Sequence, residues 1–130
     1  MFFGLFGKNP QREARRLNKD AATVVEMARV TYRGEILREI ARITREGIEQ
    51  LHALDDADED RRQHGLGRFK ALHRESRQGR DQAGLTAYTL VIIYANGLEY
   101  GDATAASREA IQDFVDEWPA ERREPRTLEG

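Results

Sequence analysis

Cysteine is absent from this chain of 130 residues, and proline occurs only at Pro10, Pro119 and Pro125. Without cysteine the protein has no disulfide bond, no thiolate metal site and no cysteine nucleophile. Residues 11–118 contain no proline, so no position there loses the backbone N–H that a helix needs. A chain of this length is expected to form one domain with a core of its own.

A long hydrophobic run is also missing. The most apolar stretch, residues 84–100, is interrupted by polar side chains and is shorter than the roughly 20 residues that a membrane-spanning helix needs. The apolar start, residues 1–6, is short and lacks a basic leader, so we expect no secretory signal. Charged residues form 34% and hydrophobic residues 39% of the chain, which argues against a disordered chain. We therefore expect a cytoplasmic protein that associates with a membrane only peripherally, if at all.

The stretch 84–100 leaves almost no polar face, as is typical of a helix surrounded by other helices. We therefore predict an all-α, single-domain bundle of four or five helices in which the apolar helix over residues 81–100 is central. The bundle spans residues 10–118. An apolar tail, residues 1–9, precedes it, and a charged tail, residues 119–130, follows it and is expected to be disordered.

Two helical stripes precede the central helix, and the second is rotated from the first near Gly34. No cluster of turn residues separates them, which favours one long helix with a hinge at Arg33–Gly34, or two helices in near-continuation that end near Leu54. The predicted inner positions are Leu17, Ala21, Val24, Ala28 and Tyr32, then Ile36, Ile40, Ile43, Gly47, Leu51 and Leu54.

A third helix is expected over residues 58–78, started by a capping box of Asp56 and Glu59. Gly65 and Gly67 weaken its beginning, so its well-formed part should start near Gly67. Asp81 should cap the central helix, and a last helix should start near residue 102 or 104 and end before Pro119. The predicted inner positions are Leu66, Phe69, Leu72 and Ser76, then Ala103, Ala106, Ala110, Ile111, Phe114, Val115 and Trp118.

Charge is unevenly distributed although the net charge is only −2. Residues 61–80 hold seven basic side chains and one acid, whereas residues 99–121 hold seven acids and one base. We expect the two segments to face each other in the fold as partial ion pairs. The alternative is that the basic stripe of residues 61–80 binds the phosphates of nucleic acid. That stripe consists of Arg62, Lys70, Arg74 and Arg77.

The N-terminus combines bulky apolar side chains with basic ones. Such a segment has the two features of a peripheral membrane anchor, namely insertion and attraction to anionic lipid. It could equally pack on its own core, enter a second subunit or dock on a partner protein. The candidate contact residues are Phe2, Phe3, Leu5 and Phe6, supported by Arg12, Arg15 and Arg16.

Catalytic and metal-binding patterns are weak. Glu49 and His52 have the i, i+3 spacing of di-iron helical bundles, with Glu46 nearby, but such a site needs a second copy of the motif and two further glutamates. His64 and His73 are too far apart in sequence to form a metal pair on one helix. No phosphate-binding loop or nucleophile elbow is present. We therefore predict no metal, no cofactor and no enzyme, with a metal-dependent helical enzyme as the most distant alternative.

These patterns favour a non-enzymatic helical protein-interaction or adaptor module with a Phe-rich N-terminal contact element. The partner is expected to be another protein or a second copy of the chain, and an anionic membrane surface is an open alternative. A nucleic-acid-binding regulator that uses the basic stripe is the second hypothesis.

Overall fold

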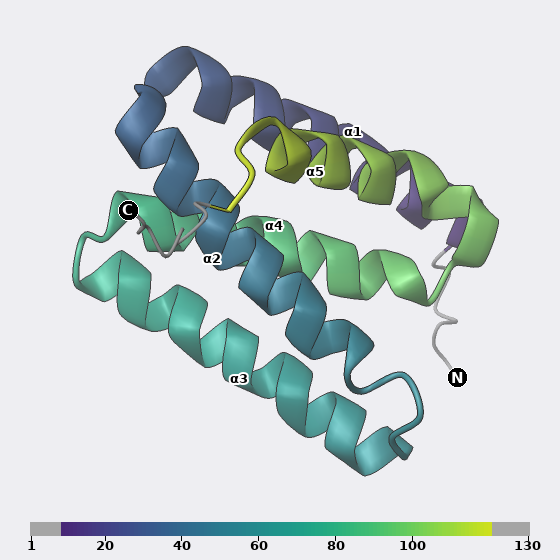
Figure 1. Cartoon of the computed structure of the whole chain (residues 1–130). Helices are drawn as coiled ribbons and strands as arrows, with labels where there is room; N and C mark the ends of the chain where they lie inside the picture. The colour runs from purple at the N-terminus through teal and green to yellow at the C-terminus, as the bar shows by residue number, and fades with distance from the viewer. Residues whose placement is uncertain (1–8, 121–130) are drawn as a thin grey trace, which may run out of the picture.

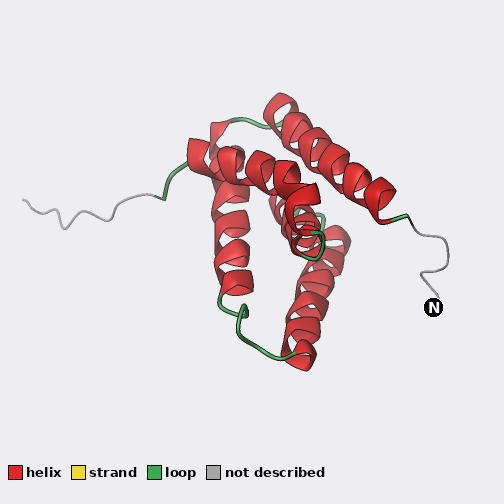
Figure 2. Cartoon of the chain, turned by 90° about the vertical axis from the view of Figure 1, so that its right-hand side faces the viewer, coloured by secondary structure: helices red, strands yellow, loops and turns green. Residues whose placement is uncertain are grey.

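The computed structural model of the chain describes residues 9–120, which form five α-helices and one short 3-10 helix (Figure 1). Figure 2 shows only helices and connecting loops in this part of the chain, so the all-α class is confirmed. The elements are α1 (Pro10–Thr31), α2 (Gly34–His52), α3 (Glu59–Gln78), α4 (Gln82–Leu98), η1 (Gly101–Thr104) and α5 (Ala105–Glu117).

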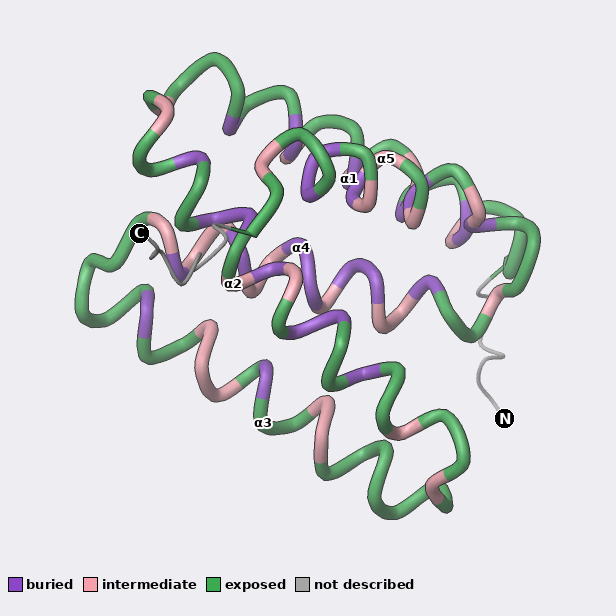
Figure 3. Tube along the Cα trace, in the orientation of Figure 1, coloured by how far each residue is buried: buried purple, intermediate pink, exposed green. Residues whose placement is uncertain are grey.

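Helix α4 is the centre of the bundle, as predicted. It packs against α1, α2, α3 and α5, and buried residues run along most of its length (Figure 3). Ala87, Leu90 and Val91 have no exposed surface at all. Helix α4 is buried because it has no polar face. Each of its sides packs against a different neighbouring helix, which removes apolar surface from water.

The other helices divide into two sides. Helices α1 and α5 pack together along one side of α4, α2 crosses it, and α3 lies along the far side (Figure 1). Helix α3 has one principal neighbour, α4, and buries only Phe69 and Ser76 fully. It is therefore the most exposed helix of the described chain.

Of the two alternatives at Gly34, one long helix with a hinge is wrong, because the chain forms two separate helices there. Helix α1 ends at Thr31, and Tyr32 and Arg33 are extended before α2 begins. The Tyr32 hydroxyl donates a 2.7 Å hydrogen bond to Oε1 of Gln82 on α4, which ties the break to the central helix. Gly34 then passes close to the ring of Trp118. A contact with distant residues, rather than a local turn signal, ends α1.

The inner face of α2 also differs from the predicted stripe. Leu37 and Ile48 are buried, whereas Ile36 is 41% exposed and Ile43 is only half-buried. Helix α2 contacts both α4 and α5, so its buried face is wider than one stripe of i, i+4 positions. The centre of this buried face is shifted by one residue from the predicted stripe. The prediction was correct at Ile40, Gly47 and Leu51.

Helix α3 spans the expected residues, but its cap differs from the predicted one and its first turns are well formed. The cap is Asp58, whose Oδ1 accepts a 2.9 Å hydrogen bond from the Arg61 amide, and the helix is regular from Glu59 onward. Gly65 does not delay the start of the helix. A β-carbon at that position would lie 2.7 Å from Cδ1 of Leu54, so its lack of a side chain makes room for the turn after α2.

Helix α5 follows the 3-10 helix η1, and its buried face differs from the predicted one only near its start. Ile111, Phe114 and Val115 are buried as expected, but Ala106 is exposed and Ser107 is buried in its place. The predicted inner residue Ala103 is exposed within η1. Its neighbourhood is fixed by α1, since Asn18 on that helix bonds to the backbone of both Ala103 and Ser107.

Within residues 9–120, no helix combines the length and the apolar character that crossing a bilayer requires. The tail at residues 1–9 lies outside the described residues except for Asn9, and the tail at 119–130 lies outside them except for Pro119 and Ala120.

Candidate interaction surfaces

The first candidate surface is the basic face of α3, formed by Lys70, Arg74 and Arg77. All three side chains are exposed. Because the helix turns 100° per residue, their i, i+4, i+7 spacing places them on one flank. None of them forms an ion pair with any carboxylate in residues 9–120. This flank therefore presents uncompensated positive charge to solvent.

The expectation that this basic segment faces the acidic one is wrong. Helix α3 and helix α5 lie on opposite sides of α4 (Figure 1), and no ion pair joins them in the described chain. The two segments adjoin the central helix in sequence, but the bundle places a helix on each of its sides. The charge separation seen in the sequence is thus kept in the folded molecule.

Arg62 does not belong to the basic face. Its guanidinium donates a 3.0 Å hydrogen bond to Oε1 of Glu59, and a second bond to the carbonyl oxygen of Ala57. The same Glu59 carboxylate accepts from Gln63, and these two donors lower the pKa of Glu59. Arg62 therefore fastens the start of α3, and of the four basic residues grouped from the sequence only three share a surface.

The second candidate surface is the acidic face of α5, formed by Glu109, Asp113 and Asp116. All three are exposed, and none forms an ion pair within residues 9–120. Asp116 only accepts a hydrogen bond from its neighbour Gln112. Glu117 is different, because it is bonded by Arg29 of α1 and so helps to hold α1 against α5.

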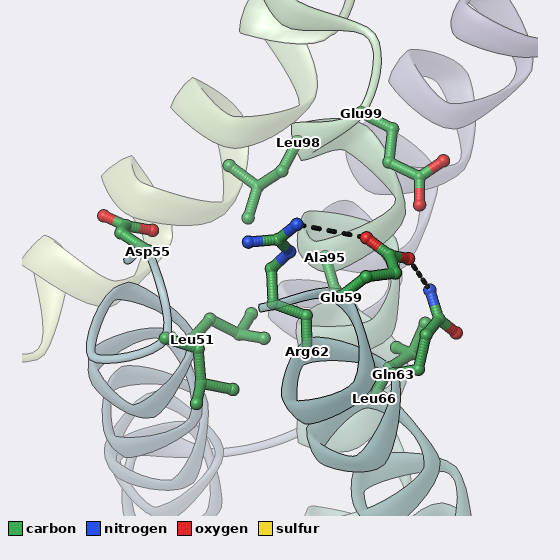
Figure 4. Close-up of a pocket in the computed structure, with 10 residues that line it drawn as sticks. Leu51, Asp55, Glu59, Arg62, Gln63, Leu66, Ala95, Leu98 and Glu99 are labelled. Atoms are coloured by element: carbon green, nitrogen blue, oxygen red, sulfur yellow. Dashed lines mark hydrogen bonds and ion pairs between the residues drawn. The ribbon is translucent and has the colours of Figure 1, made fainter. Parts of the chain in front are cut away.

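A cleft opens at the end of the molecule where α2 ends, α3 begins and α4 ends (Figure 4). Its volume is about 580 Å³. Leucine side chains form its apolar walls, and Figure 4 shows Arg62 bonded to Glu59 at its rim. The apolar lining consists of Leu51, Leu54, Leu66, Ala95 and Leu98.

The basic residues that accompany the N-terminal segment differ in availability. Arg12 and Arg15 are exposed on α1 without an ion pair in the described chain. Arg16 is bonded by Glu13 and, at 3.1 Å, by Asp20, and the Glu13 bond raises the pKa of Arg16. Arg16 is therefore occupied on its own helix. The apolar residues Phe2, Phe3, Leu5 and Phe6 lie outside the described residues.

Two of the three candidate metal ligands on α2, Glu46 and His52, are engaged elsewhere. Glu46 accepts a 2.9 Å hydrogen bond from Arg42, and Nε2 of His52 lies 3.1 Å from the hydroxyl of Tyr94. Arg42 also bonds Glu39, which lowers the pKa of Glu39. In the part of the chain that the structure describes, no three histidine or carboxylate side chains gather closely enough to hold a metal ion.

The two remaining histidines lie on opposite flanks of α3. His64 borders a groove between α2 and α3 together with Arg61 and Arg68. His73 is half-buried, and its Nε2 lies 3.1 Å from Oγ1 of Thr89. Thr89 donates its own proton to a backbone carbonyl, so Nε2 of His73 is the donor. Burial, and then the nearby charge of Arg77, lower the pKa of His73 below 6.5.

Comparison with protein families, with curated proteins and with solved structures finds no match to this chain. The surfaces are therefore interpreted from their own chemistry. Sequence reasoning found the basic face but missed that Glu109, Asp113 and Asp116 repeat its i, i+4, i+7 spacing with opposite charge. This acidic spacing can be read from the sequence, but its significance depends on the structure, in which α3 and α5 lie apart.

Proposed function

We propose that this chain is a non-enzymatic helical interaction module that binds an acidic protein surface through the basic face of α3. The observation that carries the proposal is that Lys70, Arg74 and Arg77 are exposed on one flank without a carboxylate partner in residues 9–120. Unpaired charge of one sign steers a partner of opposite charge and fixes its orientation. This positive flank adds nothing to the core of the bundle.

A protein partner suits this surface better than nucleic acid. The chain has a net charge of −2, and the acidic face of α5 would repel a long polyanion. The one aromatic residue of α3, Phe69, is buried against Tyr88 of α4 and offers no ring for stacking on a base. A short acidic surface meets the basic face without approaching α5.

The binding test uses a labelled poly-glutamate peptide as the acidic probe and a duplex DNA of similar charge as its competitor. The variant is Arg74→Glu with Arg77→Glu. The control is Arg61→Glu with Arg68→Glu, which makes the same charge change on the opposite flank, beside α2. Fluorescence anisotropy should show peptide binding that weakens with salt, is lost in the variant and is retained in the control.

Two outcomes would overturn this assignment. Equal loss of peptide binding in variant and control would show that only net charge matters. Tighter, saturable binding of the duplex, lost in the same variant and with a steep dependence on salt concentration, would instead assign a nucleic-acid-binding regulator.

The Phe-rich N-terminal segment is the second contact element of the proposed module. Helix α1 begins with Asn9 as its cap and Pro10 at its first position, so the helix start is complete without residues 2–8. Four bulky apolar side chains next to Arg12 and Arg15 provide an apolar anchor with flanking positive charge. We propose that this segment docks on a protein partner, in the cytoplasm, and that anionic membrane is its competing target.

Deletion of residues 2–8, which keeps the Asn9 cap, tests this element. The measurements are light scattering and flotation with vesicles of phosphatidylserine and phosphatidylcholine. Loss of oligomers in the deletion variant, with helical circular dichroism unchanged, supports a protein contact. Flotation of the full chain but not of the deletion variant would assign a membrane anchor, and unfolding of the deletion variant would show that the segment is core.

A further inference from the structure

We infer that the acidic surface recognised by α3 is the acidic face of α5 on a second copy of this chain, so that copies associate head to tail. This inference rests on the proposed function, because it assumes that the basic face of α3 contacts protein. It adds the identity of the partner and the geometry of the assembly.

The two faces match in spacing as well as in charge. Lys70, Arg74 and Arg77 occupy positions i, i+4 and i+7 of α3, and Glu109, Asp113 and Asp116 occupy the same positions of α5. At 1.5 Å of rise per residue, each row of charges extends for about 10 Å. Two helices laid side by side, in either direction, therefore bring three opposite charges within reach of one another.

In the described part of the chain, both faces are available for this contact. None of these six residues forms an ion pair within residues 9–120, and each is exposed. Two charged neighbours of the acidic face are already bound: Glu117 to Arg29, and Arg108 to three oxygens of its own corner. Other exposed charges, such as Arg12 and Arg15, also lack an ion pair in the described chain, but the two rows each carry three charges of one sign on one helix flank.

The fold decides how the copies are arranged. Helices α3 and α5 lie on opposite sides of α4 (Figure 1), so the two faces are separated by the central helix and we expect each to meet a different copy. The contact is therefore heterologous: each added copy leaves one basic and one acidic face free. Such an assembly grows into chains or closes into a ring of several copies, and does not stop at a dimer.

The association should be weak and sensitive to salt. Exposed ion pairs contribute little individually and are screened by dissolved ions, so the copies should separate in dilute solution. The expected result for the full chain is an average mass that rises steadily with concentration at low salt and falls to that of the monomer at high salt. Analytical ultracentrifugation and light scattering measure both trends.

Two charge-reversed variants provide the decisive test. The basic-face variant is Arg74→Glu with Arg77→Glu, and the acidic-face variant is Asp113→Lys with Asp116→Lys. Each has two faces of the same sign and should stay monomeric alone. An equimolar mixture should associate again, because the unchanged basic face of one variant fits the unchanged acidic face of the other, and the two reversed faces fit each other. The control, Arg61→Glu with Arg68→Glu, should associate like the full chain.

The outcomes separate this inference from the proposed function. A full chain that stays monomeric at every concentration and salt level, or a mixture of variants that does not associate, overturns head-to-tail assembly. If the same full chain still binds poly-glutamate and the basic-face variant does not, the proposed function stands with another acidic partner. If peptide binding is also unaffected by the variant, both fail.

Discussion

Gly47 of α2 lies directly against Val91 of α4, closer than any residue with a side chain could. A β-carbon at position 47 would lie 2.6 Å from Cγ2 and 3.1 Å from Cγ1 of Val91, which itself has no exposed surface. This close approach is the point at which α2 crosses the central helix. It holds α2 near the core and leaves α3 to cover the other side of α4.

Gly47→Ala should therefore destabilise the protein. Alanine gains about 1 kcal/mol of helix propensity over glycine, but forcing an extra carbon into a packed core costs about 1–3 kcal/mol. We expect a net loss of about 1 kcal/mol in the free energy of unfolding, measured by urea titration with circular dichroism. Val91→Ala in the same chain should recover part of the loss, because it removes the two methyl groups that clash.

Gly67→Ala is the matched control on an exposed helix. A β-carbon there meets nothing within 4 Å, and the position is exposed in the interior of α3. The substitution should stabilise the protein by about 0.5–1 kcal/mol. An equal stabilisation by Gly47→Ala would contradict the close approach of α2 to α4 at this position.

The central helix could be predicted from the sequence because its evidence is local. A helix without a polar face is expected to be surrounded by other helices, and α4 is in contact with α1, α2, α3 and α5. The faces of its neighbours could not be placed as well. Ile36 and Leu37 are both apolar and adjacent, and only the packing of α2 against two helices at once makes Leu37 the buried one.

The same limit applies to the charged surfaces. The basic and acidic segments were visible in the sequence, but whether they meet depends on which sides of α4 their helices occupy. Arg108 illustrates the point, because in the sequence it is only the single base of an acidic segment. In the structure it donates to the carbonyl oxygens of Gly97 and Gly101 and to the hydroxyl of Thr104. Those are contacts made possible by the turn between α4 and α5.

Arg108→Lys should weaken that turn although it keeps the charge. The guanidinium of Arg108 donates at 2.9 Å to Gly97, at 2.8 Å to Thr104 and at 2.9 Å to Gly101. A lysine ammonium lacks the planar fork that reaches all three acceptors. We expect a loss of about 1–2 kcal/mol in the free energy of unfolding. The exposed neighbour Glu109→Gln should change it by less than about 0.5 kcal/mol. Equal effects of the two substitutions would contradict a role of Arg108 in the turn.

The pH dependence of stability should carry a contribution from His73. Its pKa is below 6.5 in the folded protein because of burial and the charge of Arg77, so the unfolded chain binds the proton more readily. The neutral histidine contributes fully above about pH 6.5, and stability is lost as the pH falls from there toward the folded-state pKa. His73→Gln can keep the bond to Thr89 without titrating. Urea titrations across this range should show a smaller loss for the variant, and identical curves would contradict the assignment.

The start of α1 should depend on Asn9 and not on the residues before it. Oδ1 of Asn9 accepts from the amides of Gln11, at 2.9 Å, and Arg12, at 3.3 Å, and Pro10 has no amide proton to satisfy. Asn9→Ala removes both bonds and should lower the free energy of unfolding by about 1 kcal/mol. Deletion of residues 2–8 keeps the cap and should leave the free energy of unfolding unchanged. A deletion variant less stable than Asn9→Ala would show that the Phe-rich segment packs on the bundle, and its proposed role as a contact element would then be wrong.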